Sequence, residues 1–123
     1  MQNLSIIILT KNEQKNIEAA VLNSKQCTDK VIVVDSGSTD ETVILAEQAG
    51  AEVLFRAWDN DFAAQRNFAL DKIETEWVLY LDADERLNTQ LIASIKEAVE
   101  SAKLNKQYTI KRYSHAFGQQ FRH

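Results

Sequence analysis

The stretch VIVVDSGSTDE, residues 31–41, joins a run of β-branched residues to an acidic, serine-rich turn. Consecutive apolar residues of this kind indicate a strand that is buried on both faces of a sheet. The strand is expected to end at Asp35. Ser38, with Glu41 three residues later, has the spacing of a capping box. A helix is therefore expected to begin there and to end before Gly50, a residue suited to the position after a helix.

The same pattern of strand and then helix repeats on both sides of this stretch. Apolar runs predict three more strands, at residues 4–9, 52–56 and 77–81. Helical spacing or capping residues predict three more helices, near residues 16–24, 61–73 and 88–102. A further strand is expected at 108–113. This alternation with short connections predicts an α/β fold, in which a mostly parallel sheet carries helices on both faces.

The composition fits one soluble globular domain. The chain has 123 residues, of which 45% are hydrophobic and 26% charged, and its net charge is -4. Interspersed charges argue against a dedicated nucleic-acid binder. The single cysteine, Cys27, excludes a disulfide within the chain. No apolar run is long enough to span a membrane and the N-terminus lacks signal-peptide features, so a cytoplasmic location is expected.

Polar residues gather where three of the predicted strands end, at residues 10–13, 35–40 and 82–85. In open α/β sheets, ligands bind beyond the carboxyl ends of the strands, near the point where the strand order reverses. These three segments are therefore the candidate binding site.

Asp82 and Asp84 are the first candidates for chemistry. They are separated by one residue and directly follow an apolar strand, so both carboxylates can face one shared space. Their repulsion calls for a cation, and Mg²⁺ or Mn²⁺ suits such oxygen ligands. The alternative is a solvated acidic turn that caps the next helix. The position at a strand end favours the metal.

Asp35 and Arg66 could contact a nucleotide base. A carboxylate at a strand end can accept a hydrogen bond from a base N–H, although an Asx turn is the alternative for Asp35. Arg66, set among small residues in a predicted helix, could bond a base carbonyl or a phosphate, or could be an exposed helix arginine. His115 and His123 lack zinc-ligand spacing and are expected at the surface. The absence of G-x-G-x-x-G and P-loop motifs argues against dehydrogenases and P-loop NTPases.

Four motifs together resemble the family 2 glycosyltransferases: TKNE at 10–13, VVDSGSTD at 33–40, AQRN at 64–67 and LDADE at 81–85. The resemblance covers about the first 90 residues. It implies the GT-A fold, which is Rossmann-like, and an inverting transfer from a UDP-sugar. In that reaction an acceptor hydroxyl gives its proton to a carboxylate base and attacks the anomeric carbon.

The resemblance also implies roles for single residues in nucleotide binding. Thr10, Lys11 and Glu13 correspond to residues that line the uridine pocket, although Lys11 replaces an aromatic residue often found there. Asp35 corresponds to the aspartate that binds uracil, and Arg66 corresponds to an arginine that reaches the base.

For the metal, the resemblance implies Mn²⁺ or Mg²⁺ on a D-X-D motif. Asp82 corresponds to its first aspartate, near the ribose and the metal. Asp84 corresponds to the second, which binds the metal that bridges the diphosphate.

The segment from His115 to His123 resembles one branch of the family, the bacterial lipopolysaccharide-core β-glucosyltransferases. This branch implies transfer of glucose from UDP-glucose to a lipopolysaccharide-core or other lipid-linked saccharide. Basic and aromatic residues after Lys103 fit peripheral contact with the inner face of the cytoplasmic membrane. Solvated charges on an edge strand explain them equally well.

These observations predict two regions, a nucleotide-sugar-binding α/β domain at 1–102 and an incomplete start of the acceptor side at 103–123. A base within reach of the attacking hydroxyl is expected to come from later residues, so the sheet is expected to be truncated and this chain alone inactive. Two alternatives remain open. One is a nucleotidyltransferase on a similar fold, which would need a glycine-rich loop in place of TKNE. The other is a nucleotide-sugar-binding protein without turnover.

Overall fold

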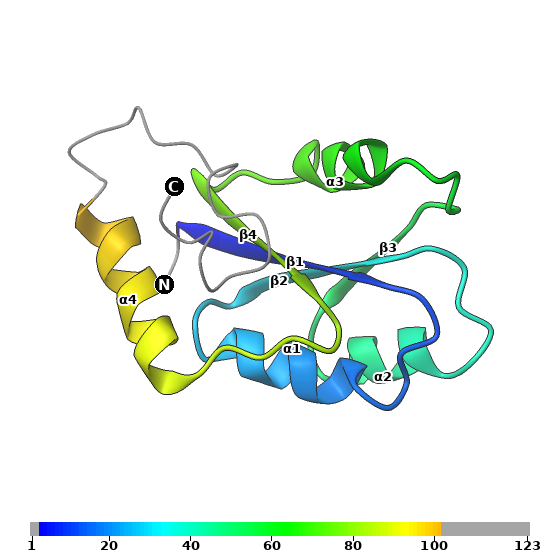
Figure 1. Cartoon of the computed structure of the whole chain (residues 1–123), viewed down its shortest axis with the longest axis horizontal. Coiled ribbons are helices and arrows are strands. Elements are labelled where there is room, and N and C mark those ends of the chain that lie inside the picture. Colours follow the sequence, from blue (N-terminus) through cyan, green and yellow to red (C-terminus); the bar gives the residue numbers. More distant parts are fainter. Residues whose placement is uncertain (1–2, 102–123) are drawn as a thin grey trace.

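The computed structural model describes residues 3–101, in which four strands alternate with four helices. The strands are β1 (Leu4–Thr10), β2 (Lys30–Asp35), β3 (Glu52–Phe55) and β4 (Trp77–Asp82). The helices are α1 (Ile17–Lys25), α2 (Thr42–Gln48), α3 (Phe62–Leu70) and α4 (Thr89–Ser101). The strands form one sheet in the order β3-β2-β1-β4, and each neighbouring pair is parallel (Figure 1). This arrangement confirms the predicted α/β fold.

The order of the strands reverses at β1. The chain builds β1, β2 and β3 outward in one direction and then returns to place β4 on the free side of β1. The switch point therefore lies between the carboxyl ends of β1 and β4, where a ligand site is expected.

Helices cover both faces of the sheet because successive strand residues point to opposite sides. Leu4, Ile6 and Ile8 of β1 belong to a core cluster that includes apolar residues of α1, α2 and α4. Ile7, between them, belongs to a second cluster that includes Ala69 of α3. Figure 1 shows α3 on the side of the sheet opposite to α1 and α2.

The predicted capping box at Ser38 and Glu41 is wrong, since α2 begins only at Thr42. The Ser38 Oγ accepts the N–H of Asn12 at 2.8 Å, and its hydroxyl donates to Asp35 Oδ1 at 2.5 Å, so Ser38 bonds to other segments and does not cap a helix. Asp40 Oδ1 instead accepts the backbone N–H of Thr42 at 3.0 Å.

Two other predicted helix starts are confirmed. Asp61 accepts the Ala64 N–H at 2.9 Å and so caps α3, and Asn88 accepts the Leu91 N–H at 2.7 Å and so caps α4. Gly50, predicted to follow α2, has a φ of 102°, and a Cβ there would lie 2.8 Å from Lys25 Cε.

Several predictions fall outside the described residues, namely the strand at 108–113, the region 103–123 and the two histidines His115 and His123. No helix within residues 3–101 is long and apolar enough to cross a membrane. Cys27 is buried, and this burial raises the pKa of its thiol.

Candidate functional site

A pocket of about 340 Å³ lies at the carboxyl edge of the sheet, at the switch point between β1 and β4. We call it the carboxyl-edge pocket. It is lined by Leu9, Thr10, Lys11, Glu13, Ser36, Trp58, Phe62, Gln65, Asp82, Ala83 and Asp84. The structure thus brings together the predicted site residues Thr10, Lys11, Glu13, Asp82 and Asp84.

Strand register explains why residues so distant in sequence meet here. Leu9 at the end of β1 is the partner of Asp82 at the end of β4. Thr10, the next residue, is the partner of Asp35 at the end of β2. Three strands therefore end at the same level, and the loops that follow them surround one space.

The turn that carries the two aspartates is held by its own neighbours. Asp82 and Asp84 are exposed, whereas Ala83 between them is buried. The Asp82 N–H donates to Glu85 Oε1 at 2.7 Å, and the Glu85 N–H donates to the Asp82 carbonyl at 3.0 Å. Two hydrogen bonds thus close the turn, and both aspartates line the pocket.

These two carboxylates fit a hard divalent cation. Mn²⁺ and Mg²⁺ take oxygen ligands and commonly keep positions for phosphate oxygens and water. Within residues 3–101, no group of three or more metal-binding side chains occurs. The two predicted metal ligands, Asp82 and Asp84, both line the carboxyl-edge pocket, and their binding of a metal stays a prediction.

Asp35 has the geometry of the Asx turn that the sequence offered as an alternative. Its side chain is buried, with 2% of its surface exposed. Oδ2 accepts the N–H groups of Gly37 at 3.0 Å and Ser38 at 2.9 Å, and Oδ1 accepts the Ser38 hydroxyl. Asp35 does not line the carboxyl-edge pocket. Its contact with a base stays a prediction.

Arg66 lines an adjoining hollow of about 260 Å³, which shares Leu9, Phe62 and Asp82 with the carboxyl-edge pocket. Its guanidinium carbon lies 5.7 Å from the centre of the Tyr80 ring. Burial raises the pKa of Tyr80 to about 12, so its hydroxyl is neutral at physiological pH. Asp35 lines neither this hollow nor the carboxyl-edge pocket.

The loop after β1 is tied to the loop after β2. Asn12, whose φ is 54°, donates its N–H to Ser38 Oγ at 2.8 Å and accepts the Thr39 N–H on Oδ1 at 2.8 Å. The Glu13 N–H donates to Thr42 Oγ1 at 2.9 Å. These bonds fix the backbone that presents Thr10, Lys11 and Glu13. Lys11 is exposed, whereas Thr10 is buried.

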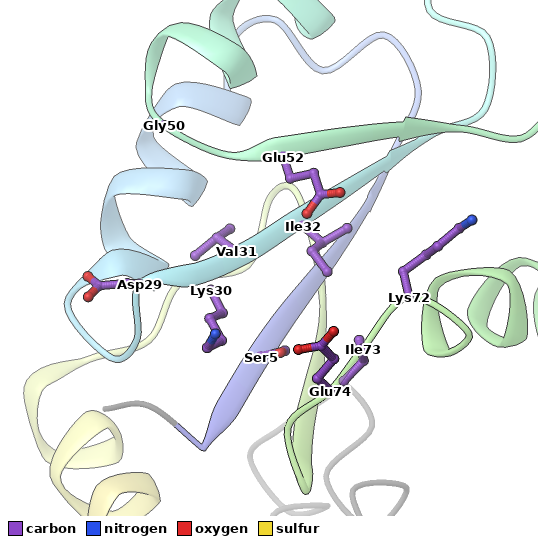
Figure 2. Close-up of a pocket in the computed structure, with 10 residues that line it drawn as sticks. All are labelled: Ser5, Asp29, Lys30, Val31, Ile32, Gly50, Glu52, Lys72, Ile73 and Glu74. Carbon is purple, nitrogen blue, oxygen red and sulfur yellow. The ribbon is translucent and has the colours of Figure 1, made fainter.

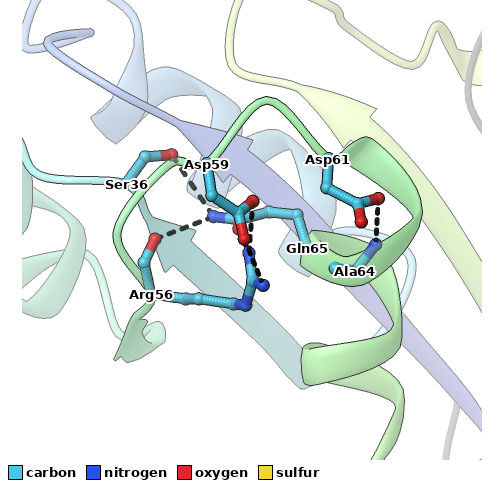
Figure 3. Close-up of polar contacts among 6 residues, drawn as sticks. All are labelled: Ser36, Arg56, Asp59, Asp61, Ala64 and Gln65. Carbon is cyan, nitrogen blue, oxygen red and sulfur yellow. Dashed lines mark hydrogen bonds and ion pairs between the residues drawn. The ribbon is translucent and has the colours of Figure 1, made fainter.

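Sequence reasoning missed a polar network centred on Gln65 (Figure 3). Gln65 is 1% exposed. Its Nε2 donates to Ser36 Oγ at 3.3 Å and to the Arg56 carbonyl at 3.1 Å, and its Oε1 accepts from Arg56 Nη1 at 2.7 Å. Gln65 lies four residues before Ala69, which is one helical turn. The two side chains therefore share a face of α3, and this spacing could have shown that Gln65 faces the core.

Arg56 also binds Asp59 through both carboxylate oxygens, at 3.2 and 2.9 Å. This contact lowers the pKa of Asp59. Together with the Asp61 cap, it ties down the loop between β3 and α3 (Figure 3). This loop includes Trp58, which lines the carboxyl-edge pocket. Sequence reasoning did not single out this ion pair, although its two residues are only three positions apart.

A second hollow, of about 370 Å³, lies at the amino ends of β1 and β2 (Figure 2). Its lining includes lysines and acids on the side away from the switch point: Asp29, Lys30, Glu52, Lys72 and Glu74. None of the predicted site residues lines it. We therefore place the candidate site in the carboxyl-edge pocket.

Comparison with known families identifies similar proteins. The model of the family described as "Glycosyl transferase family 2" matches residues 5–123. An uncharacterized glycosyltransferase of Rickettsia felis is 44% identical over 91 residues, which cover 74% of this chain and 32% of that protein. Glycosyltransferase SunS of Bacillus phage SPbeta is 33% identical over 98 residues, covering 76% of this chain and 23% of that protein. This chain thus spans a third or less of the length of these relatives.

Solved structures show the same fold. Glucosyl-3-phosphoglycerate synthase of Mycobacterium tuberculosis is 26% identical, with a TM-score of 0.60 over 68% of this chain and 34% of that one. The same enzyme in complex with Mg²⁺ and UDP gives a TM-score of 0.59, at 26% identity and the same coverage. Its complex with Mn²⁺, UDP-glucose and phosphoglyceric acid also gives 0.59, at 26% identity over 68% of this chain and 33% of that one.

Proposed function

This chain belongs to glycosyl transferase family 2 and has the GT-A fold, and we propose that it binds the UDP-sugar donor of a metal-dependent glycosyl transfer. One observation carries the proposal. Asp82 and Asp84 line the same pocket as Thr10, Lys11 and Glu13, at the switch point of the sheet. An acidic pair with room for a cation thus lies beside the loop proposed to hold the nucleoside.

The proposed donor is UDP-glucose. A similar enzyme has been solved with UDP and with UDP-glucose, which supports this class of ligand. Thr10, Lys11 and Glu13 would line the uridine, and Arg66 would reach the base from the adjoining hollow. Within its turn the Asp35 carboxylate accepts three hydrogen bonds, and a carboxylate has about four acceptor positions. Asp35 would accept a base N–H with the remaining one.

Asp82 and Asp84 would hold Mn²⁺ or Mg²⁺ between them and the diphosphate. When bound, the metal supplies charge that stabilises UDP as a leaving group. The chain's own residues position this site. Glu85 closes the acidic turn, Ala83 anchors it in the core, and the exposed ammonium of Lys11 adds positive charge to the same pocket.

For the acceptor side we propose an inverting displacement onto a lipopolysaccharide-core or other lipid-linked saccharide. The resemblance of residues 115–123 to one branch of the family supports this acceptor, and these residues lie outside the described part. We assign no catalytic base within residues 3–101, where Asp59 is paired with Arg56 and Asp61 caps α3. A donor region at 1–102, an acceptor region at 103–123 and peripheral membrane contact stay predictions.

Calorimetric titration of the chain with UDP, in the presence of Mn²⁺, tests the proposed function. UDP should bind, whereas GDP and ADP should bind at least about tenfold more weakly, a difference of 1.4 kcal/mol. Asp35→Asn should weaken UDP binding with or without metal, because the amide can present a donor to the imide N–H. Equal affinity of the three nucleotides would contradict uridine recognition.

A turnover assay separates a transferase from a protein that only binds. Release of UDP from UDP-glucose is measured with and without a heptose-containing saccharide acceptor. We expect donor binding without acceptor-dependent release by this 123-residue chain. Acceptor-dependent release would show that the chain holds its own base.

A further inference from the structure

Trp58 and Phe62 form an exposed aromatic pair at the carboxyl-edge pocket. Their ring centroids lie 4.8 Å apart with an interplanar angle of 65°, an edge-to-face contact. Trp58 is 36% exposed and Phe62 is 60% exposed, although such large apolar side chains are usually well buried. Both line the pocket, and none of the roles proposed above uses either of them. Exposed apolar surface at a cleft is typical of a binding surface.

Hydrogen bonds restrain the loop that carries Trp58. Arg56 joins its start to Asp59 and to the buried Gln65 (Figure 3). The indole N–H of Trp58 donates to Asn60 Oδ1 at 3.0 Å, and Asn60 itself has a φ of 65°. The polar atom of the indole is therefore satisfied inside the loop, and apolar ring surface remains for a ligand. Because the ring is already ordered, binding to it costs little side-chain entropy.

The chemistry of the pocket indicates which part of a ligand meets this pair. Asp82 and Asp84 make one part of the lining acidic and suited to a metal-bound diphosphate. The segment Thr10–Glu13 contributes polar and charged side chains and no aromatic ring. Among the residues that line the pocket, the aromatic ones are Trp58 and Phe62. The one flat aromatic group of a nucleoside diphosphate is its base.

We propose that Trp58, supported edge-on by Phe62, stacks on the base of the nucleotide donor. The inference rests on the proposed function, since it adds a stacking surface to the same donor site. Stacking of a base on an aromatic side chain tolerates any base and strengthens binding by roughly 5- to 150-fold. In this arrangement Trp58 provides affinity, and selection of uracil is left to hydrogen bonds from other residues.

The test compares UDP and UDP-glucose binding, with Mn²⁺ present, to the unaltered chain and to Trp58→Ala, Trp58→Phe and Phe55→Ala. Trp58→Ala should weaken both ligands by a similar factor, roughly tenfold. Trp58→Phe should keep most of the affinity. Phe55, which is 62% exposed on β3 and lines neither the carboxyl-edge pocket nor the Arg66 hollow, is the matched control and should change nothing.

Intrinsic fluorescence gives a second readout. The chain has two tryptophans, and Trp77 is 2% exposed in the core. UDP should therefore quench mainly the fluorescence of Trp58. This quenching should disappear in Trp58→Phe, although that variant still binds UDP. Persistence of the quenching in Trp58→Phe would overturn the proposal.

The outcomes separate the alternatives. Weaker binding of UDP-glucose with unchanged binding of UDP in Trp58→Ala would place the ring under the sugar and overturn base stacking. Unchanged binding of both ligands would also overturn it, while leaving the proposed function intact. If the unaltered chain does not bind UDP, the proposed function fails first and the inference fails with it.

Discussion

Arg86 Nη1 donates to the carbonyl oxygen of Ala83 at 2.6 Å, and Ala83 is the residue between the two aspartates of the candidate metal site. The same guanidinium donates to the Asn16 carbonyl at 3.1 Å, next to the start of α1. One side chain therefore ties the acidic turn after β4 to the segment that follows β1. We therefore expect this bridge to help hold the acidic turn in place beside the loop after β1.

Replacing Arg86 should weaken metal-assisted binding. Arg86→Ala frees the turn, so the gain in UDP affinity on adding Mn²⁺ should fall by roughly tenfold, as for other residues that orient metal ligands. Affinity without metal should change little. Arg86→Lys should restore only part of the gain, because an ammonium lacks the planar fork that spans both carbonyls. Calorimetry with and without Mn²⁺ measures both values, and an equal loss in the two conditions would contradict a role at the metal site.

Gln65 should contribute to folding stability. Its replacement by Ala removes a buried amide and its hydrogen bonds to the half-buried Arg56 and Ser36, so the free energy of unfolding should fall by about 1–3 kcal/mol. Urea unfolding measures the change. The exposed Gln90 of α4 is the control, and Gln90→Ala should stay within about 0.5 kcal/mol of the parent. Equal free energies of unfolding in the two variants would show that the Gln65 network does not contribute to folding stability.

Two buried hydroxyls, Thr10 Oγ1 and Ser24 Oγ, have no hydrogen-bond partner within residues 3–101. Only Thr10 lines the carboxyl-edge pocket. Thr10→Val keeps the shape and removes the hydroxyl, so stability should be equal or higher. UDP affinity should fall by roughly fivefold, the loss of about one hydrogen bond.

Ser24→Ala is the matched control for this change, because it removes the other hydroxyl far from the pocket in α1. It should leave UDP affinity unaltered. If Thr10→Val also leaves UDP affinity unaltered, the Thr10 hydroxyl is not a ligand contact.

The fold could be predicted because its signals are local. Apolar runs mark the four strands, helical spacing and single capping residues mark the helices, and alternation then dictates a parallel sheet. The capping box failed because the Ser38 oxygen accepts the N–H of Asn12 from the loop after β1, and its hydroxyl donates to Asp35.

The site could be predicted only in part, because many of its contacts join segments that are distant in sequence. Strand ends identify Thr10 and Asp82, because parallel strands end together. The contacts of Gln65 with Arg56 and Ser36 join three separate segments, so no single segment shows them. The exposure of Trp58 likewise follows from how a loop is held and not from its own sequence.

Lowering the pH should weaken the hydrogen bonds of Asp40, one of which joins the loop after β2 to the loop after β1. The Thr42 hydroxyl donates to Asp40, as do the N–H groups of Thr42 and Gln14, and these bonds lower the pKa of Asp40. A carboxylate whose pKa is lower in the folded state stabilises the fold above its unfolded pKa, about 3.9. This stabilisation is lost as the pH falls through the folded value.

Asp40→Asn should therefore make the loss of stability below about pH 4 less steep than in the parent. Urea unfolding at a series of pH values measures the slope. The exposed Asp71 is the control, and Asp71→Asn should keep the parent slope. A parent-like slope in Asp40→Asn would show that these bonds do not matter for folding.

The central claim is that Asp82 and Asp84 present a divalent cation to the diphosphate of a UDP-sugar. Calorimetric affinity for UDP with and without Mn²⁺, in the parent and in Asp84→Asn, tests it most directly. The parent should bind UDP at least about tenfold more tightly with Mn²⁺, a gain of about 1.4 kcal/mol. Asp84→Asn should keep the fold and the metal-free affinity and lose that gain. Equal affinity of the parent with and without Mn²⁺ would contradict the claim.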